Sequence, residues 1–224
     1  MKLSYVMSPY FKSLGITSTV VAEIYGINIE RENPEVEMIK NQAAKEVMKM
    51  SDEFISDNTI LQSYRDLLKS IGRSPKKFPP SAESLIQSVK HFQRFPQINV
   101  AVDSYNVIAS RNFLALGVHD LDKLGSKITF RLSDGEEPFT AVGSQKVKYT
   151  QPGDFVYADE RQILAWLDSK DSELVKLSLD TKNIVIIIQG THQTTQEYNL
   201  AALENACKLI TRFCGGTFEI QAVE

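Results

Sequence analysis

The chain has 224 residues, of which 42% are hydrophobic and 24% charged, a composition typical of globular proteins. This length allows one large domain or two small ones, and it can bury a core without a disulfide or a metal. The net charge of −3 excludes a strong overall attraction to nucleic acid or to an anionic membrane. No continuous apolar stretch opens the chain, and the aliphatic run 184–188 is far shorter than a membrane span. We therefore expect a cytoplasmic protein without a membrane partner.

The elements follow in chain order. A β-branched segment predicts a first strand over 17–29. Apolar residues at helical spacing predict helices over 35–50, 58–71, 81–92 and 199–213, with Ser81 as the N-cap of the third. Apolar segments between Gly, Asp and Pro turns predict strands over 127–132, 137–142, 154–157, 162–167, 183–189 and 217–222. The period over 98–116 is ambiguous.

This order predicts the fold class. Strands cluster in the second half and helices mostly in the first, which favours an α+β fold with a largely antiparallel central sheet flanked by helices. We expect residues 1–60 to form an N-terminal extension packed on a single core of residues 61–224.

Several common reaction centres lack their motifs. The sequence contains no P-loop, no dinucleotide-binding glycine fingerprint and no G-x-S-x-G. Two cysteines, Cys207 and Cys214, and three scattered histidines do not have metal-ligand spacing. The cysteines fit buried packing better than a redox pair. No metal and no cofactor is therefore expected.

The charge distribution is uneven. Residues 73–94 hold five basic residues and one acidic residue. This segment is either a solvated surface or an edge that contacts RNA phosphates. The basic residues are Arg73, Lys76, Lys77, Lys90 and Arg94.

Three polar clusters lie between apolar segments. The first contains Asp103, Asn106 and Ser110, which share one face if this segment is helical. The second is H-D-L-D-K-L-G over 119–125, and the third combines Asp171-Ser172 with D-T-K-N over 180–183. Asp120 and Asp180 also fit turn or cap positions, because short carboxylates accept backbone N–H bonds. Buried, bonded positions and pocket-facing positions both remain open for Asp103 and Asn106.

Five segments occur in a family order. They are Y-R-x-x-x-x-x-I-G-R-x-P-x-x-x-x-P-S-x-E-x-L from Tyr64, I-N-x-x-V-D-x-Y-N-x-x-x-S, L-G-x-H-D-L-D-K-L-G-x-x-I-x-x-R-x-x-x-G-E-E-x-F, P-G-x-x-V-Y-A-D and D-T-K-N. Together they resemble the editing module of the phenylalanyl-tRNA synthetase β subunit, the B3/B4 domain, in a free-standing form. The resemblance covers roughly residues 60–190.

The resemblance implies an α+β fold with a pocket that hydrolyses an amino acid wrongly esterified to tRNA. Such hydrolysis needs positioned polar groups and no metal or covalent nucleophile. Two departures concern the site. Gly117 stands where bacterial members have an editing histidine, with His119 two residues later, and residues 170–173 replace the Gly-Gly-Glu that senses tyrosine. Positions carried over from the family pattern are Asp103, Asn106, Asp120, Asp122, Gly125, Arg131, Glu136, Thr181 and Asn183.

The first function hypothesis is a trans-acting editing hydrolase that binds the acceptor end of tRNA, and not DNA. Asn106, His119 and Ser172 are its predicted catalytic residues. Asp103 or Glu173 is the expected partner of the substrate α-ammonium. The predicted substrate-binding residues are Asp103, Asp122, Glu136, Asp171, Glu173 and Thr181, and the five basic residues of 73–94 are the predicted RNA contacts. The alternatives are a non-catalytic module that binds an amino acid or small metabolite, and a hydrolase or lyase unrelated to tRNA.

Overall fold

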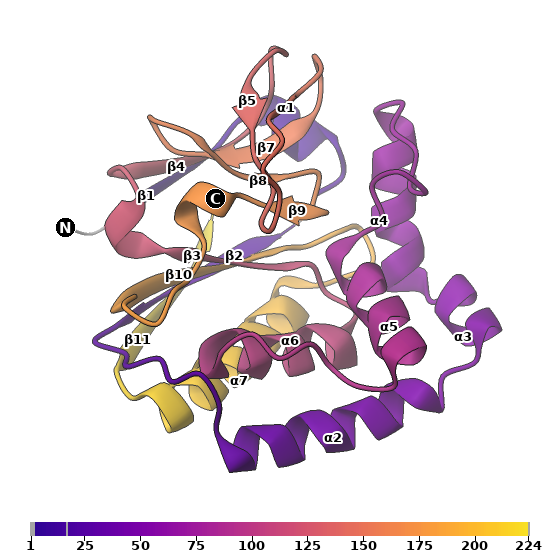
Figure 1. Ribbon diagram of the computed structural model, residues 1–224. Coiled ribbons are helices and arrows are strands. Elements are labelled where there is room, and N and C mark those ends of the chain that lie inside the picture. Colours follow the sequence, from indigo (N-terminus) through magenta and orange to yellow (C-terminus); the bar gives the residue numbers. More distant parts are fainter. Residues whose placement is uncertain (1–2, 17, 224) are drawn as a thin grey trace.

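The protein is built in three layers, two large β-sheets and a layer of helices, as Figure 1 shows, and a third, two-stranded sheet pairs β5 with β6. The computed structural model describes residues 3–16 and 18–223. The strands are β1 Ser4–Met7, β2 Thr19–Tyr25, β3 Leu116–Asp120, β4 Lys127–Leu132, β5 Pro138–Phe139, β6 Lys148–Tyr149, β7 Phe155–Ala158, β8 Ile163–Trp166, β9 Lys170–Asp171, β10 Asn183–Gln189 and β11 Thr217–Val223. The helices are α1 Pro9–Ser13, α2 Pro34–Met48, α3 Asp52–Asp57, α4 Thr59–Ser70, α5 Ser81–Phe92, α6 Val100–Asn112 and α7 Gln196–Cys214, with short 3₁₀ turns at Leu121–Lys123 and Glu173–Val175.

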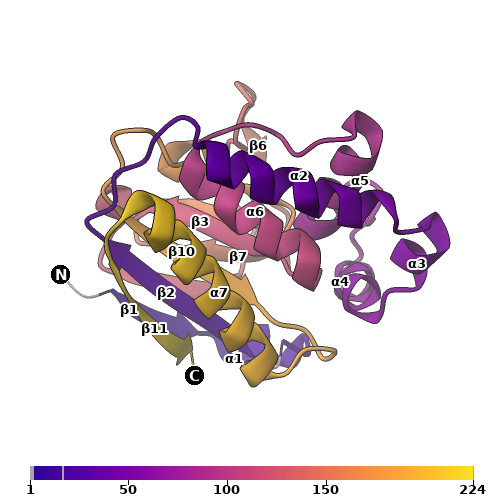
Figure 2. The same cartoon turned by 90° about the horizontal axis from the view of Figure 1, so that it is seen from below.

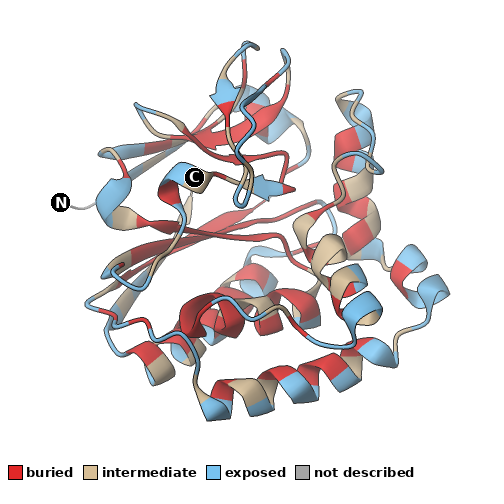
Figure 3. Ribbon diagram, in the orientation of Figure 1, coloured by how far each residue is buried: buried red, intermediate tan, exposed pale blue. Residues whose placement is uncertain are grey.

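The middle layer is a four-stranded antiparallel sheet in the order β11-β2-β10-β3. Strand β10 carries the aliphatic run, and its alternate residues face opposite layers. Val185 and Ile187 join the core between the two sheets, whereas Ile184 and Ile186 join the core under the helices. Both faces of this strand are therefore buried, as Figure 3 shows, which explains why the strand reads as a continuous apolar run.

The upper layer is a five-stranded sheet in the order β1-β4-β7-β8-β9. Its pairs are antiparallel except for β1, which runs parallel to β4. This sheet contains the single tryptophan of the chain, Trp166. The indole of Trp166 donates Nε1–H to Asp154 Oδ2 at 2.8 Å, and its ring centroid lies 5.2 Å from that of Phe78. Arg73 binds the same Asp154 carboxylate at 2.5 and 2.6 Å. This network joins the loop before α5 to the upper sheet.

The helical layer covers the free face of the middle sheet. Figure 2 shows α6 and α7 lying against that sheet, with α2 packed on α6. Helix α6 begins where the Asn99 side chain accepts a hydrogen bond from Val102 N at 2.9 Å, an ordinary N-cap. Across residues 3–16 and 18–223, none of the helices combines the length and the apolarity that a bilayer crossing requires.

The α+β class with largely antiparallel sheets is confirmed. The strands predicted over 127–132 and 183–189 have the same bounds in the structure as β4 and β10. The ambiguous segment 98–116 resolves into α6 and the start of β3. The strand predicted over 17–29 corresponds to β2, while Thr17 lies outside the described residues. Pro80, and not Ser81, occupies the N-cap position of α5, and Ser81 is the first helical residue, whose N–H donates to Asp168 O at 2.9 Å.

Residues 1–60 contribute strands to both sheets. Strand β1 pairs with β4 along the edge of the upper sheet, and β2 lies between β11 and β10 in the middle sheet. The proposed division of the chain at residue 60 therefore separates hydrogen-bonded neighbours.

Candidate functional site

A small pocket of about 30 Å³ opens where β9 of the upper sheet approaches β3 of the middle sheet. The first residue of α5, Ser81, closes one side. This volume holds about two water-sized groups. Polar side chains from both sheets line it, including Tyr157, Asp168, Ser169 and Asp171.

The strand register brings these residues together. Tyr157 on β7 lies opposite Ala165 on β8, and Ala165 lies opposite Asp171 on β9. Directly opposed residues point to the same face of an antiparallel sheet. The small Ala165 thus leaves space between Tyr157 and Asp171 in a single row. From the facing sheet, Gly117 and His119 lie on the face of β3 that is turned toward the upper sheet, because they pair with Ile187 and Val185 of the intersheet core, and Gly117 lines the pocket.

A strained turn positions Asp168. Leu167 and Asp168 follow β8 with φ angles of 59° and 47°, in the left-handed region that Gly and Asn favour. Ser169 N closes the turn on Trp166 O at 3.2 Å. Strained backbone of this kind costs about 1–3 kcal/mol per residue and persists only where the surroundings impose it. Here the buried side chain of Leu167 holds the turn, and the turn directs the Asp168 carboxylate into the pocket.

Asp168 is buried, and one of its two carboxylate oxygens accepts a hydrogen bond while the other does not. Its Oδ1 accepts a hydrogen bond from the Tyr157 hydroxyl, while Oδ2 is buried without a partner. The Oγ of Ser169 is also buried without a partner. Burial, and to a lesser extent the nearby Asp171 carboxylate, raise the pKa of Asp168 to about 7, against the lowering effect of side-chain hydrogen bonds from Tyr157 and Gln189.

His119 and Asp171 face each other across Gly117. A Cβ added to Gly117 would lie 3.3 Å from Asp171 Oδ1 and 3.3 Å from His119 Nε2. Because Gly117 has no side chain, this residue places no atom between the carboxylate and the imidazole. His119 is fully buried with both ring nitrogens unpartnered, and burial lowers its pKa to about 3, so the ring is neutral at physiological pH. Burial raises the pKa of Asp171 to about 7.

Tyrosine hydroxyls fix the walls of the pocket. Tyr64 donates to Gln189 O at 2.6 Å and accepts from Ala115 N at 3.2 Å, which ties the end of β10 to the start of β3. Tyr157 also lies 3.0 Å from Gln189 Oε1. Burial and the Asp171 and Asp103 carboxylates raise the pKa of Tyr105, so this side chain stays protonated.

The arrangement suits acid–base chemistry near neutral pH. Two carboxylates with pKa values of about 7 exchange protons at physiological pH, and perturbed groups of this kind concentrate at functional sites. A neutral imidazole can accept a hydrogen bond from a water molecule beside Asp171. Of the residues predicted from sequence, Asp171 lines this pocket, and His119 lies next to Gly117, which also lines it.

Asp168, Tyr157 and Ser169 were not predicted as site residues. Tyr157 belongs to the P-G-x-x-V-Y-A-D segment, so its place in the family pattern was a usable signal. Asp168 lies three residues before Asp171, and its role depends on a left-handed turn without Gly or Asn, which the sequence does not signal.

The structure places Asp103 and Asn106 on α6, outside the lining of this pocket. Asp103 is buried between two partners, Lys40 Nζ at 2.7 Å and Ile98 N at 3.0 Å. Its carboxylate thereby joins α6 to α2. Asn106 is half-buried on the same helix.

Ser172 and Glu173 begin the 3₁₀ turn after β9 and do not line this pocket. Ser172 Oγ accepts from Leu174 N at 3.3 Å and caps that turn, and the residue borders a separate groove of about 420 Å³. Glu173 binds Gly143 N at 2.9 Å and forms an ion pair with Lys176. Both carboxylate oxygens of Glu173 are thus engaged by local partners.

Asp122 and Thr181 lie at the other end of β3. Thr181 donates to Asp120 Oδ2 at 2.7 Å, and Asn183 donates to Asp122 at 2.9 and 3.1 Å. These bonds fasten the turn after β3 to the start of β10. Glu136 is exposed in the loop between β4 and β5.

The predicted RNA contacts fall into two groups. Arg73 is held by Asp154, and Lys90 donates to Met50 O at 2.8 Å and to Asp52 at 2.6 Å. Lys76, Lys77 and Arg94 are exposed. A further exposed cation, Lys170, stands at the mouth of the pocket.

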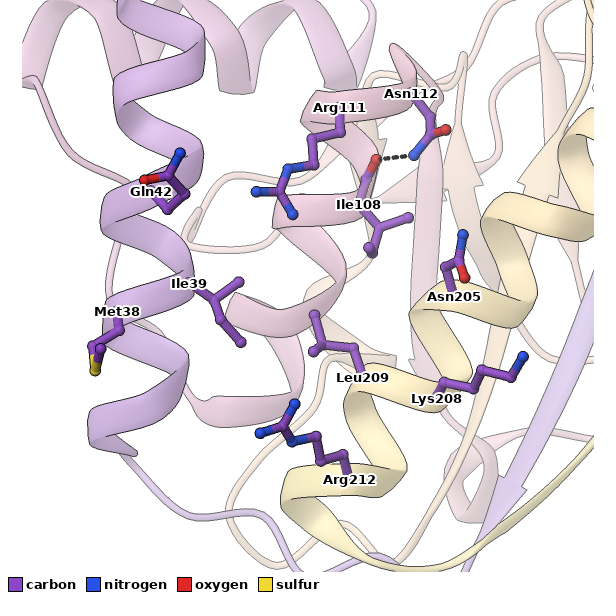
Figure 4. Close-up of a pocket in the computed structure, with 10 residues that line it drawn as sticks. All are labelled: Met38, Ile39, Gln42, Ile108, Arg111, Asn112, Asn205, Lys208, Leu209 and Arg212. Atoms are coloured by element: carbon purple, nitrogen blue, oxygen red, sulfur yellow. Dashed lines mark hydrogen bonds between the residues drawn. The ribbon is translucent and has the colours of Figure 1, made fainter.

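A larger groove of about 760 Å³ lies between α2, α6 and α7 (Figure 4). Apolar side chains such as Ile39 and Leu209 form its floor. The cations around it are paired within the chain, Arg111 with Glu46, Lys208 with Glu204 and Arg212 with Glu35. None of the sequence-predicted site residues lines this groove.

Comparisons with known proteins identify the family of this chain and a solved structure with a similar fold. The sequence model of the family described as the B3/4 domain matches residues 63–215, which is more than half of the chain. Among solved structures, an N-terminal fragment of the phenylalanyl-tRNA synthetase β subunit from Pyrococcus horikoshii is similar, with a TM-score of 0.54 and 13% sequence identity. The similarity covers 100% of this chain and 55% of that fragment, so the chain spans about half its length. No curated protein was found to match.

Proposed function

The chain belongs to the B3/4 domain family, and from this premise we propose that it is a trans-acting editing hydrolase that cleaves the ester of a mischarged aminoacyl-tRNA. The observation that carries the proposal is the space between Asp171 and His119, which Gly117 keeps open. In that space a water molecule would lie beside a carboxylate whose pKa is about 7. A cytoplasmic location is part of the proposal, because charged tRNAs are used there.

The proposed reaction needs no covalent intermediate on the protein. Asp171 accepts a proton from the water as its oxygen attacks the ester carbonyl carbon, and the neutral His119 holds the water by accepting its second hydrogen. The carbon–oxygen bond to the ribose then breaks. The proton passes to the departing ribose oxygen, so the products are a free amino acid and tRNA with an intact terminal hydroxyl. General-base help of this kind contributes about 10²–10⁴-fold.

Exposed lysines near the pocket are the proposed tRNA contacts. Lys170 lies at the mouth, and Lys76 and Lys77 lie on the loop that leads to Ser81. Arg73 and Lys90 are not included among these contacts, because Arg73 is paired with the buried Asp154 and Lys90 with the exposed Asp52. Two or three phosphate contacts give weak binding. The logarithm of the binding constant then falls linearly with the logarithm of the salt concentration, with a slope of about −0.7 per contact on a single strand.

A second candidate function is a non-catalytic module that binds a free amino acid. The engagement of Arg73 and Lys90 in ion pairs favours this reading, since it removes two of the five predicted RNA contacts. A module of this kind predicts ligand binding that changes little with ionic strength.

A deacylation panel tests the proposed function. The purified chain is mixed with tRNAs charged correctly and incorrectly, at low and high salt. We expect release of the amino acid from one or a few mischarged pairs, and at least a tenfold slower release by Gly117→Ala, whose methyl group fills the space beside Asp171. Gly125→Ala is the matched control, because its methyl group would meet only the side chains of Asp159 and Glu160, at the other end of β3.

Two results would contradict the proposal. Absence of release from every pair, with no tRNA binding at low salt, would leave the amino-acid module. Equal rates for Gly117→Ala and Gly125→Ala would remove the space beside Asp171 from the mechanism. For the tRNA contacts, Lys76→Glu with Lys77→Glu should weaken binding and flatten its salt dependence, whereas Lys208→Glu on α7 should do neither.

A further inference from the structure

Strand β11 forms one edge of the middle sheet, and among the described residues no strand pairs with its outer side. The strand has 7 residues and keeps a continuous register with β2 from Thr217 to Val223. Figure 2 shows β11 at the margin of the molecule, beyond helix α7. An edge strand of this length presents a row of backbone donors and acceptors that can pair with another strand.

The other edge strands of the two large sheets are short or buried. Strand β1 has 4 residues, β9 has 2, and all 5 residues of β3 are buried. Strand β11 is longer, its residues are exposed or half-buried, and it contains neither the lysine nor the proline that commonly protects an edge. Its register with β2 also has no bulge. Within residues 3–16 and 18–223, β11 is therefore the edge that is least protected against pairing.

The register shows which backbone groups of β11 point outward. Gly190 N donates to Ser18 O at 2.6 Å, and these two residues extend the register of β2 with β10 by one step. Backbone groups alternate in direction along a strand, so the even-numbered residues of β2 bond to β10 and the odd-numbered residues to β11. The partners of the odd-numbered residues are residues 217, 219, 221 and 223. The N–H and C=O groups of Phe218, Ile220 and Ala222 consequently point away from β2.

These outward groups are complementary to themselves. Two copies of β11 can lie antiparallel about a two-fold axis at Ile220, where this residue exchanges hydrogen bonds with the same residue of the second copy. Phe218 and Ala222 then exchange hydrogen bonds across the axis. Three N–H groups of each copy meet three C=O groups of the other, which gives six hydrogen bonds with no outward group left over. The two four-stranded sheets become one continuous sheet.

The side-chain charges favour this register. It places Glu219 opposite Gln221 of the second copy, where a carboxylate can accept a hydrogen bond from an amide. A displacement by two residues towards the start of the strand would place the two Glu219 side chains opposite each other, and directly opposed like charges are destabilising. A displacement the other way would leave the outward groups of Phe218 beyond Val223, the last residue of the opposing strand.

We propose that β11 pairs with β11 of a second copy of this chain, so that the protein forms a two-fold symmetric dimer through this edge. The candidate pocket lies at the opposite edges of the sheets, beside β3 and β9. Pairing through β11 therefore leaves both pockets of the dimer accessible. The inference does not depend on the proposed function, because it uses no residue of the pocket.

The experiment uses the full chain without tRNA. Sedimentation velocity from micromolar to millimolar concentration measures the dissociation constant of the dimer. Amide hydrogen exchange by NMR, below and above that concentration, locates the interface. We expect at least tenfold slower exchange of the Phe218, Ile220 and Ala222 amides in the dimer. The amides of Glu219 and Gln221 are bonded to β2 in both states, so their exchange should change much less.

Two variants of Gln221 test the register with opposite signs. Gln221→Lys places an ammonium opposite Glu219 of the second copy, on both sides of the axis, so it should tighten the dimer at least threefold. Gln221→Glu places a carboxylate there and should weaken the dimer at least threefold. A general loss of stability cannot produce shifts in both directions. Gln145→Lys and Gln145→Glu, at an exposed position between β5 and β6, are the controls and should change neither constant.

Slower exchange of the outward amides together with opposite shifts for the two Gln221 variants would support the dimer. A chain that stays monomeric up to millimolar concentration would overturn it. A dimer in which the outward amides exchange as fast as in the monomer would use another surface and would also overturn it. Slower exchange with unchanged constants for both Gln221 variants would overturn the register centred on Ile220.

Discussion

Asp168 combines three unfavourable features in one residue, a left-handed backbone, a buried carboxylate and an oxygen without a partner. Each of them costs free energy of folding, and no described contact offsets all three. Residues that lower stability in this way are concentrated where proteins bind ligands or carry out reactions. The local cost is thus an argument for function that does not depend on the family.

The pH dependence of stability tests the state of this carboxylate. Burial raises the pKa of Asp168 and of Asp171 to about 7 from an ordinary value of 3.8. Between these values the folded chain keeps protons that the unfolded chain has released. The contribution of these two groups to stability is therefore largest below pH 4, falls as the pH rises towards 7 and then levels off, by a few kcal/mol for each group.

Asp168→Asn removes one of the two titrating groups, because an asparagine side chain binds no proton in this pH range. We expect urea unfolding to show a shallower fall in the free energy of unfolding between pH 4.5 and 8 for this variant than for the unmodified chain. The gain over the unmodified chain should be greatest at pH 8. Curves that run parallel over the whole range would show that Asp168 is ionised at neutral pH.

At this scale the sequence predicts some site residues and not others. His119 and Asp171 could be predicted, because they stand in polar motifs between apolar segments. Asp103 stands in the same kind of context, yet its partner Lys40 lies 63 residues earlier in the chain. A sequence motif does not show such a distant contact, so buried and pocket-facing aspartates look alike.

At the scale of elements, the Lys40–Asp103 pair joins helices α2 and α6. The two side chains are 4% and 1% exposed. Removing one member of a buried ion pair leaves the other charge without compensation, which costs about 3–5 kcal/mol. The pair is therefore a specific link between the outer helix and the helical layer.

A double-mutant cycle measures this link. Lys40→Met should lower the free energy of unfolding by about 3 kcal/mol, and the double variant Lys40→Met/Asp103→Leu should lose less than the sum of the two single changes. Lys45→Met, on the same helix and exposed, is the control. Additive losses would show that the two side chains do not interact in solution.

Turn residues at both ends explain why two strands were predicted with the correct bounds. Strands β4 and β10 have clear turn residues on both sides. The boundary between α6 and β3 was not predicted, because the residue that caps the C-terminus of α6 is Phe113, with a φ of 55°. Helices commonly end on Gly in this conformation, so a phenylalanine there gives no stop signal.

At the scale of the whole molecule, the middle sheet depends on a strand from the start of the chain. Strand β2 is hydrogen-bonded on one edge to β10 and on the other to β11. Its removal would expose both neighbours and open the intersheet core that carries the site. The division into an extension and a core of residues 61–224 is thus open to a direct test.

We expect the fragment 61–224 to be expressed without a cooperative fold. Its NMR spectrum should be poorly dispersed and its thermal unfolding broad, whereas the full chain should unfold in one transition. Addition of a peptide of residues 1–60 should restore part of the dispersion. A well-dispersed spectrum and cooperative unfolding of the fragment alone would instead support the predicted extension.

The single tryptophan of the chain is placed beside the pocket. Trp166 is the last residue of β8 and directly precedes the strained turn of Leu167 and Asp168. Its indole is 4% exposed and hydrogen-bonded to Asp154. Tryptophan emission, excited selectively over the eight tyrosines, therefore comes from one known position, and a ligand that displaces the turn will change it.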